Sequence, residues 1–139
     1  MEPLFEHRME FAGYETRVLE LEGRGEPIVL LHGWSDSADT WRCVLARLGR
    51  QERRAVAVDM PGFGTASRLD RAKGVMEQLD AFAAAAVRHL AAEHGRQDVY
   101  VAGKSLGGAV ALRLAEHDDL PLAGVIPVAP GGGDMPVWF

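Results

Sequence analysis

The sequence has a single cysteine, Cys43, among its 139 residues. One cysteine excludes a disulfide within the chain, and its place in a predicted helix makes a buried, structural thiol the default expectation. A reducing cytoplasm is the compartment that fits this cysteine usage. The histidines and the cysteine do not have the spacing of metal ligands, so we expect no metal site.

An excess of basic charge is also missing, since 15 Lys and Arg residues stand against 20 Asp and Glu residues, for a formal net charge of −5. Without a basic stripe interleaved with aromatic residues, nucleic acid is not an expected partner. The short basic cluster of Arg47, Arg50, Arg53 and Arg54 predicts a solvated face. No apolar run is long enough to span a bilayer, and residues 1–8 lack the pattern of a secretory signal.

The most informative stretch present is 99–108, where a β-prone apolar run leads into Gly103-Lys104-Ser105-Leu106-Gly107 and then a helix-forming segment. This is the Gly-x-Ser-x-Gly pattern of a nucleophile elbow, in which the serine occupies a strained turn between a strand and a helix. Side chains at Gly103 and Gly107 would crowd that turn. The pattern predicts Ser105 as a nucleophile and the Leu106 amide, at the helix start, as an oxyanion donor.

These residues have two other interpretations. The pattern could arise by chance in a glycine-rich chain, although the strand before it and the helix after it are the context that the motif requires. Gly103-Lys104-Ser105 could also end a phosphate-binding loop. That loop needs its first glycine where Asp98 stands, and the residues between form an apolar strand, so the spacing excludes it.

A second apolar run, Pro27–Leu31, predicts a buried strand that leads directly into His32-Gly33-Trp34. In a serine acyl-transfer site of this architecture, the second oxyanion donor is a backbone N–H from the loop after that strand. We assign this role to the Trp34 amide and expect Gly33 to let the backbone approach the substrate. His32 has a catalytic interpretation, but a histidine ending a buried strand more often braces its loop through hydrogen bonds.

A third strand, Arg54–Val58, leads into Asp59-Met60-Pro61-Gly62-Phe63-Gly64, whose proline and glycines predict a sharp turn. We expect the Asp59 carboxylate to hold this turn by accepting backbone N–H bonds, in preference to acting as a catalytic acid. Gly62 and Gly64 do not form a dinucleotide fingerprint because no G-x-G-x-x-G pattern follows. No cofactor is therefore expected.

Taken together, the strand-His32-Gly33-Trp34 segment, the Asp59-x-Pro61-Gly62-x-Gly64 turn and the Ser105 elbow resemble the first half of an α/β-hydrolase, in the order of that family. The resemblance implies an α/β fold with a mostly parallel sheet and helices on both faces. It covers the chain as one partial domain, 1–139, with about five strands ending at Gly124–Val128. Helices are predicted at about 41–48, stopping at Gly49, at 75–94 and at 108–116.

The resemblance also indicates what the chain lacks. The triad of the family runs Ser, then Asp or Glu, then His along the chain. No histidine follows His117, which ends the predicted elbow helix, and Asp134 is the one candidate acid after the last strand, with a structural role in a turn as its alternative interpretation. We therefore expect a chain truncated after the strand that follows the elbow helix, without lid or C-terminal strands, and nearly inert alone. The apolar last strand, left at an edge, predicts completion by a second chain or by self-association.

Two functions follow from these expectations. The first is a cofactor-independent serine hydrolase for an ester, thioester or related acyl compound, with the acid and the histidine outside this chain. Serine at position 105 argues against epoxides and haloalkanes, on which the family acts with an aspartate nucleophile. The second is a non-catalytic, hydrolase-like half-domain that associates with another polypeptide.

Overall fold

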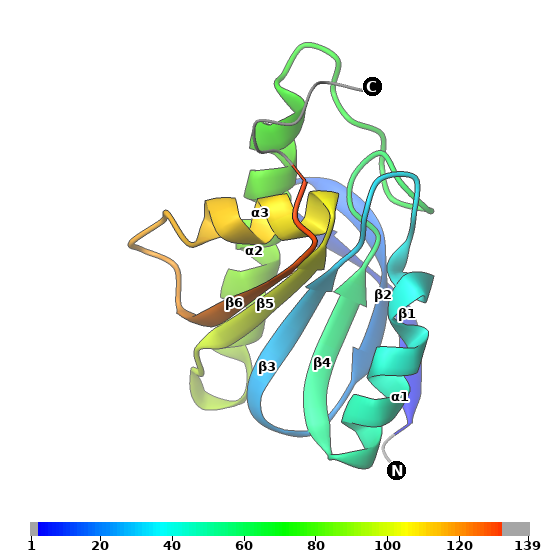
Figure 1. Cartoon of the computed structure of the whole chain (residues 1–139), viewed down its shortest axis with the longest axis vertical. Coiled ribbons are helices and arrows are strands. Elements are labelled where there is room, and N and C mark those ends of the chain that lie inside the picture. Colours follow the sequence, from blue (N-terminus) through cyan, green and yellow to red (C-terminus); the bar gives the residue numbers. More distant parts are fainter. Residues whose placement is uncertain (1–2, 132–139) are drawn as a thin grey trace.

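The computed structural model describes residues 3–131 and has one six-stranded sheet, in the order β1-β2-β4-β3-β5-β6 (Figure 1). The β1–β2 and β2–β4 pairs are antiparallel, and β4–β3, β3–β5 and β5–β6 are parallel. The predicted fold class is therefore confirmed. The strands are β1 Leu4–Phe11, β2 Tyr14–Leu21, β3 Arg24–Leu31, β4 Arg53–Val58, β5 Val99–Lys104 and β6 Leu122–Val128.

Helices cover both faces of this sheet. Successive side chains of a strand point to opposite faces, so the apolar residues of a buried strand need a covering layer on each side. On β3, Val29 and Leu31 join the apolar core under α2 and α3, whereas Leu30 joins a second core under α1. Figure 1 shows α1 and α2 on opposite sides of the strands. The helices are α1 Arg42–Arg50, α2 Val75–Ala92 and α3 Leu106–Leu114, and short 3-10 turns lie at Ala38–Trp41 and Glu93–Gly95.

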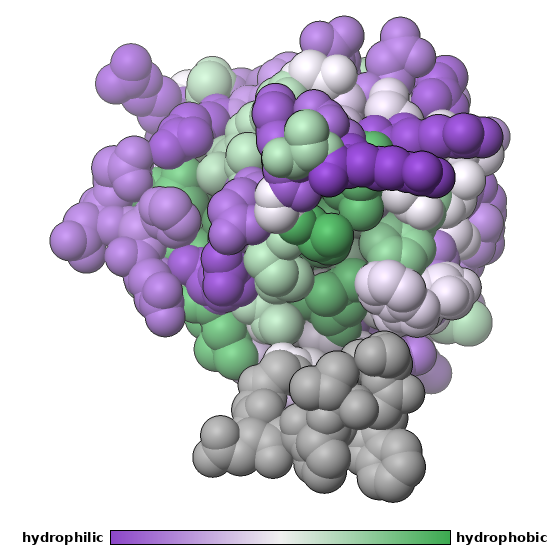
Figure 2. All heavy atoms as spheres, turned by 90° about the horizontal axis from the view of Figure 1, so that it is seen from above, coloured by the Kyte–Doolittle hydropathy of each residue, from purple (hydrophilic) through white to green (hydrophobic). Residues whose placement is uncertain are grey.

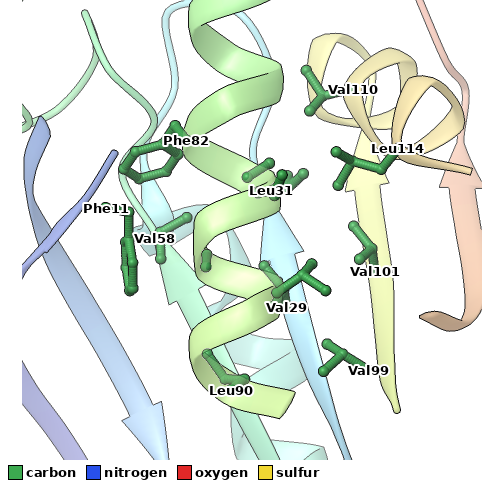
Figure 3. Close-up of a cluster of buried hydrophobic side chains, with 14 of the residues drawn as sticks. Phe11, Val29, Leu31, Val58, Phe82, Leu90, Val99, Val101, Val110 and Leu114 are labelled. Atoms are coloured by element: carbon green, nitrogen blue, oxygen red, sulfur yellow. The ribbon is translucent and has the colours of Figure 1, made fainter. Parts of the chain in front are cut away.

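The larger core lies between α2, α3 and the sheet (Figure 3). Phe82 of α2 is fully buried, and its ring meets that of Phe11 edge to face with centroids 5.6 Å apart. Apolar residues recur at helical spacing along α2, and of these Leu79, Phe82 and Leu90 are buried. Val75, the first residue of the helix, is instead 44% exposed.

Some boundaries differ from those predicted. Strand β1 was not predicted as a separate element, because most of its residues are exposed and it lacks a continuous apolar face. Helix α1 continues through Gly49, which is buried, to Arg50. The left-handed backbone that ends such a helix belongs to Glu52, with φ +55°.

Two predictions about single side chains were wrong. Cys43 is exposed, because the buried residues of α1 are Leu45 and Gly49. Arg54 is only 2% exposed and forms an ion pair with Glu93, since its strand position directs it into the packed interior. Across the described part of the chain, none of the helices combines the length and the apolar character that crossing a membrane would need.

The parallel strands end together at one edge of the sheet, the upper edge in Figure 1. Chemistry in open parallel sheets is located at this carboxyl edge. Strand β6 closes the described sheet on one side, and its Ile126 and Val128 are 49% and 46% exposed. The strand predicted to be left at an edge therefore does lie at an edge among residues 3–131.

Candidate active site

Ser105 lies between the end of β5 and the start of α3, on a backbone with φ +54° and ψ −114°. The Ser105 N–H donates to the Val128 carbonyl at 2.9 Å, and the Ser105 carbonyl accepts from Ala109 and Gly131, both at 3.0 Å. An L-residue adopts this backbone conformation only when its surroundings impose it. The turn therefore holds a serine at a strained position on the carboxyl edge.

Two glycines allow this turn to pack against its neighbours. A Cβ atom at Gly103 would stand 2.0 Å from the Gly107 carbonyl oxygen. One at Gly107 would stand 2.2 Å from the carbonyl oxygen of Leu31, so the first turn of α3 lies directly against the end of β3. Both obstacles are backbone atoms, which cannot rotate away as a side chain can.

The strain at Ser105 predicts that Ser105→Gly stabilises the fold. Glycine adopts positive φ freely, which relieves about 1–3 kcal/mol of strain against about 0.5–1 kcal/mol of extra unfolded-chain entropy. We expect a net gain of about 1 kcal/mol over Ser105→Ala, which keeps a Cβ atom, measured by urea unfolding. Equal stability of the two variants would show that the turn is unstrained.

The loop after β3 approaches Ser105 through Gly33. A Cβ atom at Gly33 would lie 3.4 Å from the Ser105 Cβ and 4.0 Å from its Oγ, so the Gly33 backbone is beside the hydroxyl. The next residue, Trp34, is 64% exposed, and its ring stands edge to face against Phe63 with centroids 5.3 Å apart. The structure thus brings the predicted residues Gly33, Trp34 and Ser105 together.

Helix α3 begins at Leu106, immediately after Ser105. The first amides of an α-helix have no partners within the helix, and its dipole favours negative charge at that end. The Leu106 amide is therefore in the chain position that the oxyanion assignment requires. Its role, like that of the Trp34 amide, stays a prediction.

His32 is fully buried and both ring nitrogens contact backbone groups. The Met60 N–H donates to Nε2 at 2.8 Å, which requires an unprotonated Nε2, so Nδ1 carries the proton and donates to the Gly33 carbonyl at 2.7 Å. Burial is the main cause that lowers the pKa of His32. This arrangement favours the brace interpretation, since a general base needs a nitrogen available to the nucleophile.

The neutral His32 predicts that acid weakens the fold through this group. Below about pH 6.5 the unfolded chain binds a proton at this histidine and the folded chain does not, so the free energy of unfolding falls as pH decreases from about 7 to 5, by up to about 1.4 kcal/mol per pH unit. His32→Gln should remove that slope, and His117→Gln, on the surface, should keep it. Urea unfolding at several pH values measures this, and equal slopes in both variants would contradict it.

Asp59 is fully buried at the end of β4, and its carboxylate accepts several hydrogen bonds. The amides of Ala38 and Thr65 donate to it at 2.8 and 3.0 Å, and Arg17 donates from Nε at 3.1 Å. Burial opposes ionisation, but the bonds from Arg17 and the two amides outweigh it and hold the pKa of Asp59 below its usual value. Asp59 therefore has the contacts of the predicted turn-holding carboxylate.

Sequence reasoning did not single out Arg17, on β2. Its guanidinium contacts Asp59, Asp39 and Glu6, and the bonds to Asp39 and Asp59 raise the pKa of Arg17. The bonds from Arg17 and Arg42 lower the pKa of Asp39 to about 2. Arg17 is one of three charged residues in β2, beside Glu15 and Glu20, so the sequence neither singles it out nor identifies its partners.

The remaining histidines with described side chains lie away from the elbow. His7 is on β1 and pairs with Glu20, His89 is on α2 and pairs with Glu93, and His117 follows α3. The candidate acid, Asp134, lies outside the described residues. Within 3–131, no three His, Cys, Asp or Glu side chains are grouped so that they could hold a metal ion.

Figure 2 looks onto the carboxyl edge and shows hydrophobic side chains gathered in the middle of this face, with hydrophilic ones around them. Partly buried apolar residues that the loops and α3 bring to this edge are Phe63, Leu69 and Leu106. Lys104, directly before Ser105, is exposed. The surroundings of Ser105 thus suit an apolar group beside the hydroxyl.

Comparison with known proteins decides the family. The sequence pattern of the α/β hydrolase fold matches residues 26–138. The chain belongs to the α/β hydrolase fold family. Within this family the elbow, the loop after β3 and the turn after β4 are the segments on which the resemblance rested.

Relatives in this hydrolase family carry several different names. The chain is 34% identical over 100 residues to a pimeloyl-[acyl-carrier protein] methyl ester esterase of Vibrio vulnificus, covering 70% of this chain and 34% of that protein. It is 34% identical over 116 residues to a 2-hydroxy-6-oxo-6-(2'-aminophenyl)hexa-2,4-dienoic acid hydrolase of Metapseudomonas resinovorans, covering 78% and 37%. The chain therefore spans about a third of the length of these curated relatives.

Solved structures agree on the fold. Epoxide hydrolase A from Mycobacterium thermoresistibile superimposes with a TM-score of 0.77 at 23% identity, covering 88% of this chain and 38% of that one. At this identity the likeness shows a shared fold alone. The names of the relatives do not agree on one substrate, so they do not identify the substrate of this hydrolase-family chain.

Proposed function

We propose that this chain is the nucleophile-bearing part of a serine hydrolase for an ester, thioester or related acyl compound. The observation that carries the proposal is the strained Ser105, held between β5 and α3 with the Gly33 backbone against it. Esterase and hydrolase relatives support the same reaction class. A reducing cytoplasm remains part of the proposal and rests on the single cysteine.

In the proposed mechanism, Ser105 Oγ attacks the acyl carbonyl carbon, and the carbonyl oxygen becomes an oxyanion. The amides of Leu106 and Trp34 donate to that oxyanion, which stabilises the transition state more than the ground state. The alcohol or thiol then leaves and water hydrolyses the acyl-enzyme. The apolar surroundings of Trp34 and Phe63 would contact the acyl chain.

Ser105 needs a base to remove its proton. Of the histidine side chains described, only that of His32 is close to the elbow, and its nitrogens are engaged with Met60 and Gly33. We therefore propose that the catalytic histidine is supplied from outside this chain. We propose the same for its acid, with Asp134 as the one alternative within the chain.

Fluorophosphonate labelling, read by intact mass, tests this proposal. We expect slow modification of Ser105 in the chain alone, increasing with added imidazole as a substitute base, and no adduct on Ser105→Ala at any imidazole concentration. Absence of an adduct on the parent chain at every imidazole concentration would refute Ser105 as the nucleophile. Rapid labelling without imidazole would instead show that the base lies within the chain.

The exposed edge of β6 supports a second candidate function, association with another polypeptide or with a second copy. Ile126 and Val128 are half-exposed on a strand with an unpaired side in the described sheet, and such edges pair readily. Sedimentation velocity should show a concentration-dependent larger species that Ile126→Lys reduces, while Leu112→Lys, on exposed α3 surface, does not. A monomer at all concentrations would contradict self-association.

A further inference from the structure

The carboxylate of Asp59 joins three segments that are far apart in the sequence. Its Oδ1 accepts from the Ala38 amide, in the segment that leads from β3 into α1. Its Oδ2 accepts from the Thr65 amide, in the turn after β4, and Arg17 of β2 approaches both oxygens. The orientation of one buried carboxylate therefore sets where two loops of the carboxyl edge lie.

Arg17 determines that orientation by a two-point contact. Its Nε donates to Oδ2 at 3.1 Å and its Nη2 lies 3.3 Å from Oδ1, so each oxygen has one guanidinium donor and one loop amide. A guanidinium fork fixes the plane of a carboxylate, which a single ammonium group cannot do. Arg17 is itself held by Asp39 at 2.7 Å and Glu6 at 3.2 Å.

The positioned loop is the one beside Ser105. Between Ala38, bound to Asp59, and His32, bound to the Met60 amide, it contains Gly33 and Trp34. Both hydrogen bonds connect this loop to residues at the end of β4, and Gly33 of the loop lies against Ser105. A shift of the Asp59 carboxylate would therefore displace the segment that carries the Trp34 amide.

We propose that Arg17 is a positioning residue of the hydrolytic site, which acts through Asp59 to hold the Gly33–Trp34 backbone beside Ser105. This inference rests on the proposed function of Ser105. Arg17 does not touch the substrate in this account. The role depends on the two-point contact of the guanidinium with the carboxylate. If positive charge alone were needed, lysine could replace Arg17.

The test uses a thiol as a reporter of the oxyanion site, since a thiolate at a well-formed helix start and amide pair is stabilised without a base. The parent protein for this test carries Cys43→Ser and Ser105→Cys, so that its only thiol is at position 105. The pH profile of its alkylation by iodoacetamide is compared with those of three variants that add Arg17→Gln, Arg17→Lys or Arg42→Gln. Arg42 also bonds Asp39 but no bond from it to Asp59 is found, so it is the matched control. Amide hydrogen exchange of Ala38 and Thr65 is followed by NMR in the same proteins.

We expect Arg17→Gln and Arg17→Lys each to lower the alkylation rate at pH 7 by about tenfold, equivalent to a rise of about one in the thiol pKa. Both should raise exchange at Ala38 and Thr65 by about tenfold or more, relative to the core amides of Val29 and Val101, while Arg42→Gln changes either readout less than twofold. Arg17→Lys equal to the parent in both readouts would overturn the proposal, because charge alone would then suffice.

Failure of the oxyanion site and failure of the role of Arg17 give different results in this experiment. If the parent thiol titrates like an ordinary cysteine, the proposed oxyanion site of Ser105 is wrong, and Arg17 is then not a positioning residue of a hydrolytic site whatever its variants do. If the parent thiol is activated but the Arg17 variants leave its pH profile unchanged, the proposed function stands and the role of Arg17 is refuted. If amide exchange rose as much at Val29 and Val101 as at Ala38 and Thr65, the variants would have lost stability throughout the fold. That result would also refute the role of Arg17.

Discussion

Gly107→Ala is expected to lose about 3 kcal/mol or more of unfolding free energy, or to abolish cooperative unfolding. The added methyl would stand 2.2 Å from the Leu31 carbonyl oxygen and 2.6 Å from that of His32. Relief would require α3 to move away from β3, and α3 carries Val110 and Leu114 of the main core. Urea unfolding followed by circular dichroism measures the loss.

Gly124→Ala is the matched control for this prediction. At Gly124, on the edge strand β6, a methyl would meet only the ring of Tyr100, at 3.2 Å. That side chain is partly exposed and can turn aside, so we expect a loss below about 1 kcal/mol. Equal stability of Gly107→Ala and the parent would show that the elbow does not need the close contact between α3 and β3.

Asp59→Asn is expected to lose about 3–5 kcal/mol, the usual effect of removing one partner from a buried ion pair. The amide group that replaces one oxygen would face an N–H donor of Ala38, Thr65 or Arg17, so at least one buried donor loses its acceptor. Unlike the glycine variant, this change leaves the volume of the interior unchanged. Urea unfolding at pH 7 measures it.

Asp39→Asn provides the comparison, because Asp39 binds the same Arg17 from an exposed position. Surface ion pairs contribute about 0–1 kcal/mol, so Asp39→Asn should lower the free energy of unfolding by less than about 1 kcal/mol.

The lowered pKa of Asp59 adds a pH test. The stabilisation by the Asp59 charge is present above the ordinary carboxyl pKa and is lost as acid protonates the folded form. The gap between the parent and Asp59→Asn should therefore narrow below about pH 4, and a pH-independent gap would contradict the role of the charge.

The segments that could be predicted from the sequence are those with local patterns. The elbow is readable because a β-prone run, two glycines around Ser105 and a helix-forming segment are adjacent in the chain, and steric crowding alone specifies the turn. The His32-Gly33-Trp34 loop is readable for the same reason, since an apolar strand precedes it directly. These patterns also gave the sheet type and the family, which the matched residues 26–138 bear out.

Long-range contacts account for most of what could not be predicted. Arg17 and Asp59 are 42 residues apart, and nothing in either neighbourhood specifies the other. The burial of Cys43 and of Arg54 was predicted wrongly, because residue type alone does not determine which side of a short helix or strand packs against the core. Strand β1 was missed as a separate element since an edge strand needs no buried face to pair, and backbone bonds to β2 suffice.

We propose that the backbone around Ser105 is organised to stabilise a negative charge at that position. In a Cys43→Ser chain, the pH dependence of alkylation by iodoacetamide is compared between Ser105→Cys and Ser67→Cys, the latter in the turn after β4 and away from any helix start. We predict that the thiol at position 105 has a pKa well below the ordinary value of about 8.5. It should be alkylated at least about ten times faster at pH 7 than the thiol at position 67. Two thiols that titrate alike would contradict it.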